Sequence, residues 1–313
     1  MIVVGVDENG LGPDLGPMVV TGVAIECDDY APLLLSTIGP KACRIRDSKE
    51  VFSGPNKLAR GERPTLPWCR VIGWSGDSYV DLRRFLCGTV DPDRYCAPDT
   101  SRLCENSADR ELPLWCSNSE VATLAESIRS AMNGRFRFIV AKARFLCARA
   151  VQCECRRFGS KVDLDARMLV EVVREIRKSS NEDILVYCGR AGNLHDYSQA
   201  LSSVDRDFAP PIERQRGKIV SAYDVPGLGH IEFVKGVEHK HSPAALASMI
   251  GKYLREVSLD LICEHVVPGM RASGYPGDPK TAIIVAHSRD RRRAMGLQEE
   301  CFLRREFHAG KGG

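Results

Sequence analysis

The fold of this chain is decided by a stretch near its N-terminus, Gly5-Val6-Asp7-Glu8-Asn9-Gly10-Leu11-Gly12-Pro13, which continues as Leu15-Gly16-Pro17-Met18-Val19-Val20. Apolar and β-branched residues on both sides of the loop predict a buried strand over Ile2–Val6 and a second strand over Met18–Ile25. Successive strand residues point to opposite faces, so the loop must turn one of the two adjacent carboxylates if both are to serve one site. Three glycines in that loop allow its backbone to approach another group closely.

Length and composition set the broad class of protein. The chain has 313 residues, of which 43% are hydrophobic, enough for one large domain or for one domain with an elaboration. The net charge of +3 permits a polyanionic partner without requiring one. No run of about 18 apolar residues is present, so no membrane-spanning segment is expected. The apolar start of the chain is short and meets Asp7 at once, unlike a signal peptide, and the 13 cysteines are an odd number. We therefore expect reduced thiols and a cytoplasmic location.

Hydrophobic periodicity predicts further elements downstream. Strands are expected at Trp68–Trp74, Arg135–Phe145, Ile184–Tyr187 and His230–Lys235, and helices at Ser119–Met132, Asp165–Lys178 and from Ser242-Pro243 onward. From about residue 53 to 133 the pattern is weak, which indicates an insertion on the surface. Within it, the segment Asp77–Ser117 holds four cysteines whose spacing matches no common zinc motif, Cys87, Cys96, Cys104 and Cys116.

Four segments, taken in order, resemble the motifs of the ribonuclease HII family. The N-terminal loop is similar to the family's Asp-Glu-X-Gly-Arg-Gly-Pro motif and the Gly-Pro that follows it, and Asp47-Ser48-Lys49 matches its Asp-Ser-Lys motif. Ala247-Ser248-Met249-Ile250-Gly251-Lys252 resembles its Ala-Ser-Ile-X-Ala-Lys helix. Ser273-Gly274-Tyr275-Pro276-Gly277-Asp278-Pro279-Lys280-Thr281 looks like the archaeal form of its Gly-Tyr motif. The resemblance covers most of the chain except the stretch of about 53–133.

This resemblance implies a fold and a domain arrangement. The expected fold is α/β and RNase H-like, with a five-stranded mixed β-sheet flanked by α-helices. The expected domain covers residues 1–265 with the insertion at about 53–133, and residues 266–313 form a C-terminal helical segment and tail.

The family cleaves the RNA strand of RNA–DNA hybrids, including at single ribonucleotides in duplex DNA, by two-metal hydrolysis with Mg²⁺ or Mn²⁺. Such cations take oxygen ligands, mainly carboxylates. The resemblance implies that Asp7, Glu8 and Glu238, ten residues before Ser248, are catalytic and hold the metal. It also implies that the partner is nucleic acid, an RNA–DNA hybrid or a duplex that contains ribonucleotides.

Two positions depart from the family pattern. The third family carboxylate follows the strand that here ends Leu185-Val186-Tyr187, and that position is taken by Cys188. A thiol is mostly protonated near neutral pH and prefers softer metals, and the simpler interpretation of Cys188 is a small buried hydrophobe. Asp196 lies nearby in sequence and could substitute. Leu11 replaces the family's arginine in a loop that senses the 2′-hydroxyl, the group that marks RNA.

Other family roles concern the substrate. Tyr275 matches the family tyrosine that stacks on the deoxyribose beside the RNA–DNA junction. The alternative interpretation of Tyr275 is an aromatic residue of a turn that packs on the protein surface. Lys49 and Lys280 match positions near the phosphate backbone, although isolated lysines are usually solvated. Gly10 and Gly12 permit close backbone approach to the substrate. The basic run Arg291–Arg293 could contact phosphates or form a solvated face.

Three hypotheses therefore follow from the sequence. The leading one is a metal-dependent endoribonuclease. The second is a catalytically impaired relative that binds nucleic acid without cleaving it, which Cys188 and Leu11 favour. The third is an interaction protein that works through its insertion. A softer metal held by His239, His241 and Cys188 is a further possibility.

Overall fold

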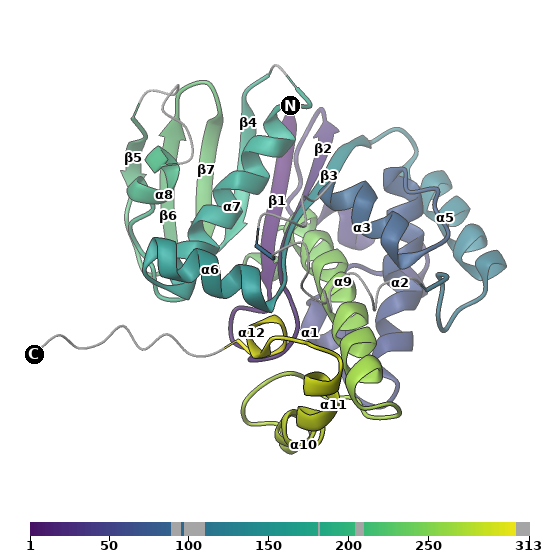
Figure 1. The fold of residues 1–313 in the computed structure, drawn as a ribbon. Coiled ribbons are helices and arrows are strands. Elements are labelled where there is room, and N and C mark those ends of the chain that lie inside the picture. The colour runs from purple at the N-terminus through teal and green to yellow at the C-terminus, as the bar shows by residue number, and fades with distance from the viewer. Residues whose placement is uncertain (89–94, 97–109, 181, 204–209, 305–313) are drawn as a thin grey trace, which may run out of the picture.

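Seven strands form one mixed sheet in the computed structural model, which describes residues 1–88, 95–96, 110–180, 182–203 and 210–304 (Figure 1). The strand order is β3-β2-β1-β4-β7-β6-β5. The strands are β1 (Ile2–Asn9), β2 (Met18–Cys27), β3 (Phe136–Leu146), β4 (Ile184–Gly189), β5 (Ile212–Gln215), β6 (Val220–Val225) and β7 (Gly229–Val234). The predicted α/β class and mixed sheet are confirmed, whereas the predicted number of five strands is too small.

The strand β1 is the centre of the sheet. It pairs antiparallel with β2 through the tight loop that follows Asn9, and parallel with β4, with Val6 opposite Cys188. The strand β4 is in turn parallel to β7. Because β1, β4 and β7 run in the same direction, their carboxyl ends meet at one edge of the sheet, where ligands commonly bind in α/β proteins.

Helices cover both faces of the sheet. The helices are α1 (Ser48–Val51), α2 (Lys57–Ile72), α3 (Tyr79–Cys87), α5 (Asn118–Met132), α6 (Ala148–Phe158), α7 (Lys161–Arg177), α8 (Ser198–Ser203), α9 (Ser242–Val266), α10 (Pro279–His287), α11 (Arg289–Ala294) and α12 (Glu299–Phe302). Short 3-10 turns occur at η1 (Leu34–Thr37), η2 (Lys41–Cys43) and η4 (Val237–His239). Helices α6 and α7 pack on one face, and α9, with α2 outside it, packs on the other (Figure 1).

Each face of β1 contributes to a different hydrophobic core. Val3 belongs to the core with α9, and Val4 and Val6 belong to the core with α7. A Cβ added to Gly5 would lie 2.0 Å from the backbone nitrogen of Ala244. Gly5 therefore lets the first turn of α9 lie directly on β1, which brings the next turn of α9 close to the end of the strand.

The predicted strand at Trp68–Trp74 is wrong, because the segment forms the end of helix α2 and the turn after it. Pro64 and Pro67 lie inside this helix. Tertiary packing overrides local propensity here. Trp68 is fully buried and its indole N–H donates to the carbonyl oxygen of Cys43 at 2.8 Å.

The described part of the stretch 53–133 joins the main core. Glu62 of α2 is fully buried, and its Oε1 accepts hydrogen bonds from the backbone N–H of Trp115 at 2.6 Å and of Cys116 at 2.9 Å. Its Oε2 accepts from Leu114 N–H at 2.8 Å and from the Tyr253 hydroxyl on α9 at 2.7 Å. One carboxylate thus connects α2, the segment before α5 and α9. Cys104 lies outside the described residues.

Side chains of the C-terminal helices α10 and α12 pack against the far half of α9, and α12 also contacts α6. Ile284 and Phe302 form a small core there with Leu259 and Ile262 of α9. The described chain then returns to the N-terminal loop, where Leu303 pairs with Leu15 in an isolated bridge. The predicted domain boundary at residue 265 stays a prediction.

Candidate active site

A polar cleft of about 380 Å³ opens at the carboxyl ends of β1 and β4. Residues from distant parts of the sequence line it. These are Asp7, Glu8, Asn9, Gly10, Leu11, Gly12, Asp47, Ser48, Lys49, Gly189, Arg190, Gly192, Asn193, Lys235, Gly236, Glu238, Ser248, Lys252 and Tyr275. All four motif segments singled out in the sequence therefore reach one cleft.

The two adjacent carboxylates of β1 leave the strand on opposite faces. Asp7 lies on the face of α9, where the Ser248 hydroxyl donates to it. Glu8 lies on the face that Val6 shares, and its Oε1 accepts a hydrogen bond from the Leu11 backbone N–H. Both carboxylates nevertheless line the cleft, and the loop after β1 folds back far enough for its Leu11 N–H to reach Glu8.

The pKa of Asp7 is raised to about 8, mainly by burial and in addition by the neighbouring charges of Glu238 and Glu8. Burial also raises the pKa of Glu8, against the Leu11 N–H and the buried Arg255. Burial and nearby like charges both disfavour the ionised form of a carboxylate. Such a group therefore favours either a bound proton or a bound cation.

A fourth carboxylate lies behind these two. Asp165 of α7 is 1% exposed, and its Oδ1 has no hydrogen-bond partner among the described residues. Burial, Glu8 and Asp7 all raise its pKa well above the ordinary value. An unpaired buried carboxylate is costly unless it is protonated or faces a cation. Asp165 therefore adds to the concentration of acidic groups around Asp7 and Glu8, although these three carboxylates do not bring their oxygens within 4.8 Å of one another.

The carboxyl end of β4 presents no carboxylate to the cleft. Cys188 is fully buried and packs in the core on the α7 face, and burial raises the pKa of its thiol. Its neighbour Gly189 is the residue beside Asp7, and a Cβ added there would lie 2.3 Å from the Asp7 Oδ1. No side chain fits at position 189 unless Asp7 moves. Asp196, the predicted substitute, instead pairs with Arg216 at 2.9 Å and does not line the cleft.

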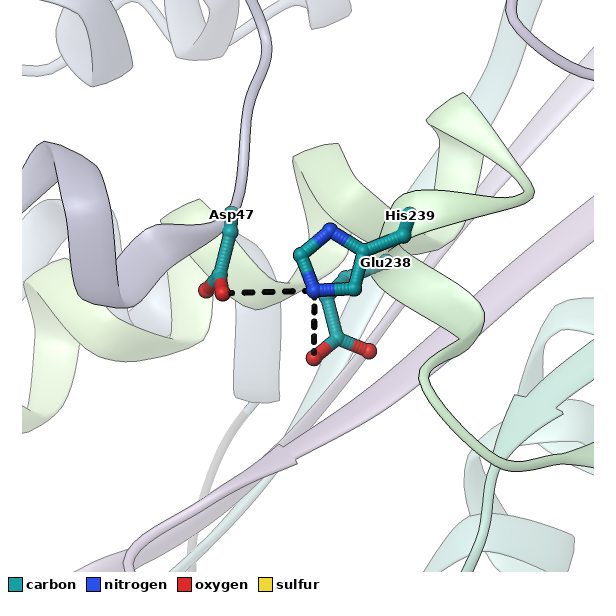
Figure 2. Close-up of side chains that lie close together, drawn as sticks. All are labelled: Asp47, Glu238 and His239. Carbon is teal, nitrogen blue, oxygen red and sulfur yellow. Dashed lines mark ion pairs between the residues drawn. The ribbon is translucent and has the colours of Figure 1, made fainter.

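Glu238 lies across the cleft from β1, in the short turn η4. The neighbouring His239 directs its Nε2 toward Glu238 and toward Asp47, which begins α1 (Figure 2). Among the described residues, these three form the single group whose potential ligand atoms all lie within 4.8 Å of one another. His241 lies apart from this group, because its ring stacks on Tyr187 at 3.5 Å between centroids.

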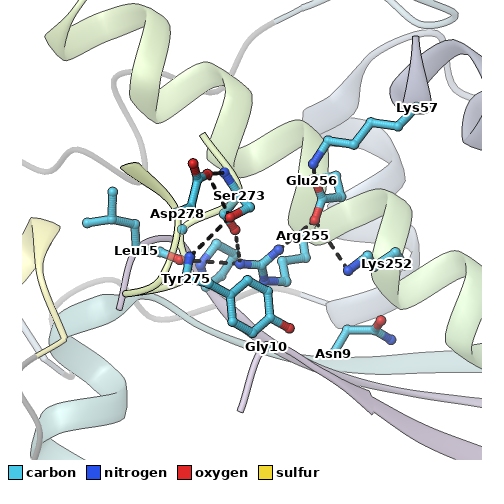
Figure 3. A network of polar contacts seen from close by, with 12 residues as sticks. Asn9, Gly10, Leu15, Lys57, Lys252, Arg255, Glu256, Ser273, Tyr275 and Asp278 are labelled. Carbon is cyan, nitrogen blue, oxygen red and sulfur yellow. Dashed lines mark hydrogen bonds and ion pairs between the residues drawn. The ribbon is translucent and has the colours of Figure 1, made fainter. Parts of the chain in front are cut away.

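The glycine-rich loop is held from beneath by two buried arginines. Arg255 of α9 donates to the carbonyl oxygens of Ser273 at 3.1 Å and Leu15 at 3.4 Å (Figure 3). Arg304 donates to the Gly10 carbonyl oxygen, and its own backbone N–H donates to Asp14 at 2.8 Å. The loop that carries the first motif is thus fixed to α9 and to the C-terminal segment.

Tyr275 stands at the rim of the cleft with 44% of its surface exposed. Its ring lies over Arg255, with 5.9 Å between the guanidinium carbon and the ring centroid. A Cβ added to Gly12 would lie 3.3 Å from the Tyr275 ring. The glycine-rich loop and the Gly-Tyr segment therefore form one continuous surface.

The cationic side chains are only partly those expected. Lys49 lines the cleft, whereas Lys280 does not. Within the run Arg291–Arg293, Arg292 is 5% exposed and donates to the Val285 carbonyl oxygen at 3.1 Å, so it is not free to contact phosphate. Sequence reasoning missed the lining residues Arg190 and Lys235.

Asp165 was also missed, although the sequence carried a signal for it. It shares the apolar face of its helix with Leu169 and Val173, a position where a carboxylate is unexpected. A charged residue on a buried helix face requires a partner, and here the neighbours are the carboxylates of β1.

No protein-family model matches the chain, and no curated protein matches its sequence. Similar solved structures include RNase HII from Archaeoglobus fulgidus in complex with PCNA, at 16% identity and a TM-score of 0.44, covering 96% of this chain and 93% of that one. Ribonuclease H2 from Pyrococcus horikoshii is 15% identical with a TM-score of 0.44, covering 97% and 93%. Bst-RNase HIII in complex with Mn²⁺ is 15% identical with a TM-score of 0.44, covering 98% and 67%. We assign no activity from these similarities. No helix among the described residues is long and apolar enough to cross a membrane.

Proposed function

We propose that this protein is a metal-dependent endoribonuclease of the ribonuclease HII type, acting in the cytoplasm on RNA–DNA hybrids or on ribonucleotides in duplex DNA. One observation carries the proposal. The four motif segments, more than 200 residues apart at their extremes, line the same polar cleft. Motifs that matched by chance would have no physical reason to meet at one place.

In this proposal Asp7, Glu8 and Glu238 hold Mg²⁺ or Mn²⁺. The bound cation would offset the charge that develops on the scissile phosphate and activate the attacking water. The chain's own residues position the nucleic acid. Lys49 and Lys235 line the cleft and offer positive charge to phosphates, and Tyr275 offers an exposed ring for stacking.

A second function is favoured by a specific observation. The cleft lacks a carboxylate from β4, because Gly189 occupies the place beside Asp7. Leu11 also lacks the hydrogen-bond donors of an arginine. Both features favour a protein that binds the same nucleic acids without cleaving them.

Cleavage assays separate these two functions. We expect cleavage of a uniform RNA–DNA hybrid or of a duplex with one ribonucleotide in Mg²⁺ or Mn²⁺, and loss of at least about 100-fold in Asp7→Asn, because that variant removes a charged ligand. Cys188→Ala is the matched control. Its side chain points into the core, so cleavage should persist despite a modest loss of stability.

Three outcomes are informative. Cleavage that survives Asp7→Asn would contradict the proposed site. Hybrid binding without cleavage under either cation would favour the binding function. Loss of cleavage in a folded Cys188→Ala variant would contradict the placement of the Cys188 thiol in the core, because the thiol would then take part in the reaction.

A further inference from the structure

The cluster of Asp47, Glu238 and His239 has an unusual geometry. The Nε2 of His239 lies 3.6 Å from Oδ2 of Asp47 and 3.9 Å from Oε1 of Glu238. Both distances exceed those of hydrogen bonds. An imidazole nitrogen also carries at most one hydrogen, so the two carboxylates would have to share a single N–H, and both lie too far away for that. Hydrogen bonding therefore does not account for two carboxylates that converge on one nitrogen.

A second histidine shows what ordinary pairing looks like. His230 of β7 also faces two carboxylates, but it uses a different ring nitrogen for each. Its Nδ1 lies 2.6 Å from Asp224, and its Nε2 lies 3.4 Å from Glu232. Its donors diverge around the ring, as in a hydrogen-bonded bridge. In the Asp47–Glu238–His239 cluster both carboxylates instead face the same ring nitrogen, and the three potential ligand atoms lie within 4.8 Å of one another (Figure 2).

We propose that Asp47, Glu238 and His239 form a binding site for a divalent transition-metal cation such as Mn²⁺ or Zn²⁺. Ligands about 2.1 Å from a tetrahedral ion lie about 3.4 Å from one another, close to the 3.6 Å and 3.9 Å that separate the His239 Nε2 from the two carboxylates. A mixed set of imidazole and carboxylate ligands favours these ions over Mg²⁺, which takes oxygen ligands almost alone.

The local backbone prepares both carboxylates for this site. Asp47 accepts the Lys49 N–H through Oδ1 at 2.8 Å, which fixes the side chain and leaves Oδ2 directed at His239. Glu238 follows Gly236, whose left-handed backbone (φ 66°) begins the turn η4. The side chains of Asp47 and Glu238 are 13% and 14% exposed, so two of the three ligands are already largely withdrawn from water.

The site has a consequence for the cleft. Glu238 is close enough to Asp7 for its charge to raise the Asp7 pKa, and it also belongs to the histidine cluster. It would therefore stand between the cation of the proposed nuclease site and this second cation. Asp47 and His239 then add ligands on the α1 side of the cleft, whereas β4 offers none. This role in the cleft rests on the proposed function, but cation binding itself does not.

The test uses the full chain with Mn²⁺ alone, because Mn²⁺ avoids the many thiols of this protein. Electron spin echo spectroscopy of bound Mn²⁺ detects a coordinated imidazole through its ¹⁴N nucleus. We expect ¹⁴N modulation in the unaltered protein and in His230→Ala, and its loss in His239→Ala. We also expect His239→Ala to weaken Mn²⁺ binding at this site by at least about tenfold. His239 is 59% exposed, so its replacement should leave the fold intact.

Absence of ¹⁴N modulation in the unaltered protein would overturn the proposal, as would modulation that persists in His239→Ala. Asp7→Asn separates this inference from the nuclease proposal. Cleavage should be lost in Asp7→Asn while the ¹⁴N signal stays. If the protein cleaves hybrids but never shows the ¹⁴N signal, the nuclease proposal stands and the proposed histidine-containing cation site is wrong. If the protein shows the signal but cleaves nothing, the cation site stands and the nuclease proposal is wrong.

Discussion

Asp7 links the chemistry of the site to the stability of the fold. Its pKa is raised to about 8 by burial and by the charges of Glu238 and Glu8. A carboxyl group whose pKa is raised on folding stabilises the folded state below its unfolded pKa, near 4, and this contribution is lost as the pH rises through the folded value. Without a divalent cation, the protein should therefore lose stability between pH 5 and pH 8.5.

Asp7→Asn should remove much of that loss. After allowance for solvent screening, we expect the variant to be about 1–3 kcal/mol more stable than the unaltered protein at pH 8.5 in EDTA, and nearly equal at about pH 4. Denaturant unfolding at the two pH values measures the difference. Equal pH dependence in the two proteins would contradict the shifted pKa, and Asp290→Asn, at an exposed position in the first turn of α11, is the control.

Cys188 and Gly189, at the end of β4, could be interpreted only in part from the sequence. The sequence identified the end of β4 as the place where a carboxylate is missing, and it offered a buried hydrophobe as the simpler interpretation of Cys188. It did not show which of the two residues faces Asp7. That choice depends on the register of β1 with β4, because a shift of one residue moves every side chain to the other face.

At the scale of elements, Glu62 is the residue on which the packing of α2 depends most. It accepts three backbone N–H groups and the Tyr253 hydroxyl while fully buried. Glu62→Ala would leave four donors without an acceptor. We expect a loss of about 3–5 kcal/mol in the free energy of unfolding, with faster proteolysis between α3 and α5. Denaturant unfolding and limited proteolysis measure both effects.

Glu126→Ala provides the matched control for Glu62. Glu126 lies on α5 with a side chain that is 71% exposed, and it pairs only with Arg129 across one helical turn. Such a pair contributes at most about 0.5 kcal/mol. Similar losses in both variants would contradict the role assigned to the buried carboxylate.

Elements were predicted best where periodicity and burial agree. The strands β1, β2, β3, β4 and β7 and the helices α5, α7 and α9 all follow from their patterns. The strand β5 was missed because its four residues are all exposed, so it has no buried face to produce an alternating pattern. Helix α2 was missed because two prolines conceal a helix that its neighbours stabilise.

At the scale of the whole molecule, the cleft could be predicted only in part. The sequence provided the motifs, and their order along the chain resembled a family. It could not show that the C-terminal segment returns beneath the N-terminal loop, where Arg304 reaches Gly10. It also could not show that Asp47 meets His239, since no local pattern encodes a contact across almost 200 residues.

The net charge of +3 is small, so any attraction for nucleic acid must come from where the charges lie. Lys49 and Lys235 line the cleft, while Lys178 lies beyond the C-terminal end of α7 and pairs with Glu175 at 2.6 Å.

If the cleft holds the backbone of a hybrid duplex, each lysine that contacts a phosphate contributes about 0.9 to the slope of log K against log salt. Replacement of Lys49 and Lys235 together by alanine should therefore lower that slope by about 1–2, with the hybrid bound in Ca²⁺ to prevent cleavage, whereas Lys178→Ala should leave it unchanged. The measurement needs no catalysis, so it tests the cleft as a nucleic-acid site whether or not the chain cleaves. An unchanged slope in the double variant would mean that the duplex binds elsewhere, and the carboxylates of the cleft would then need a different substrate.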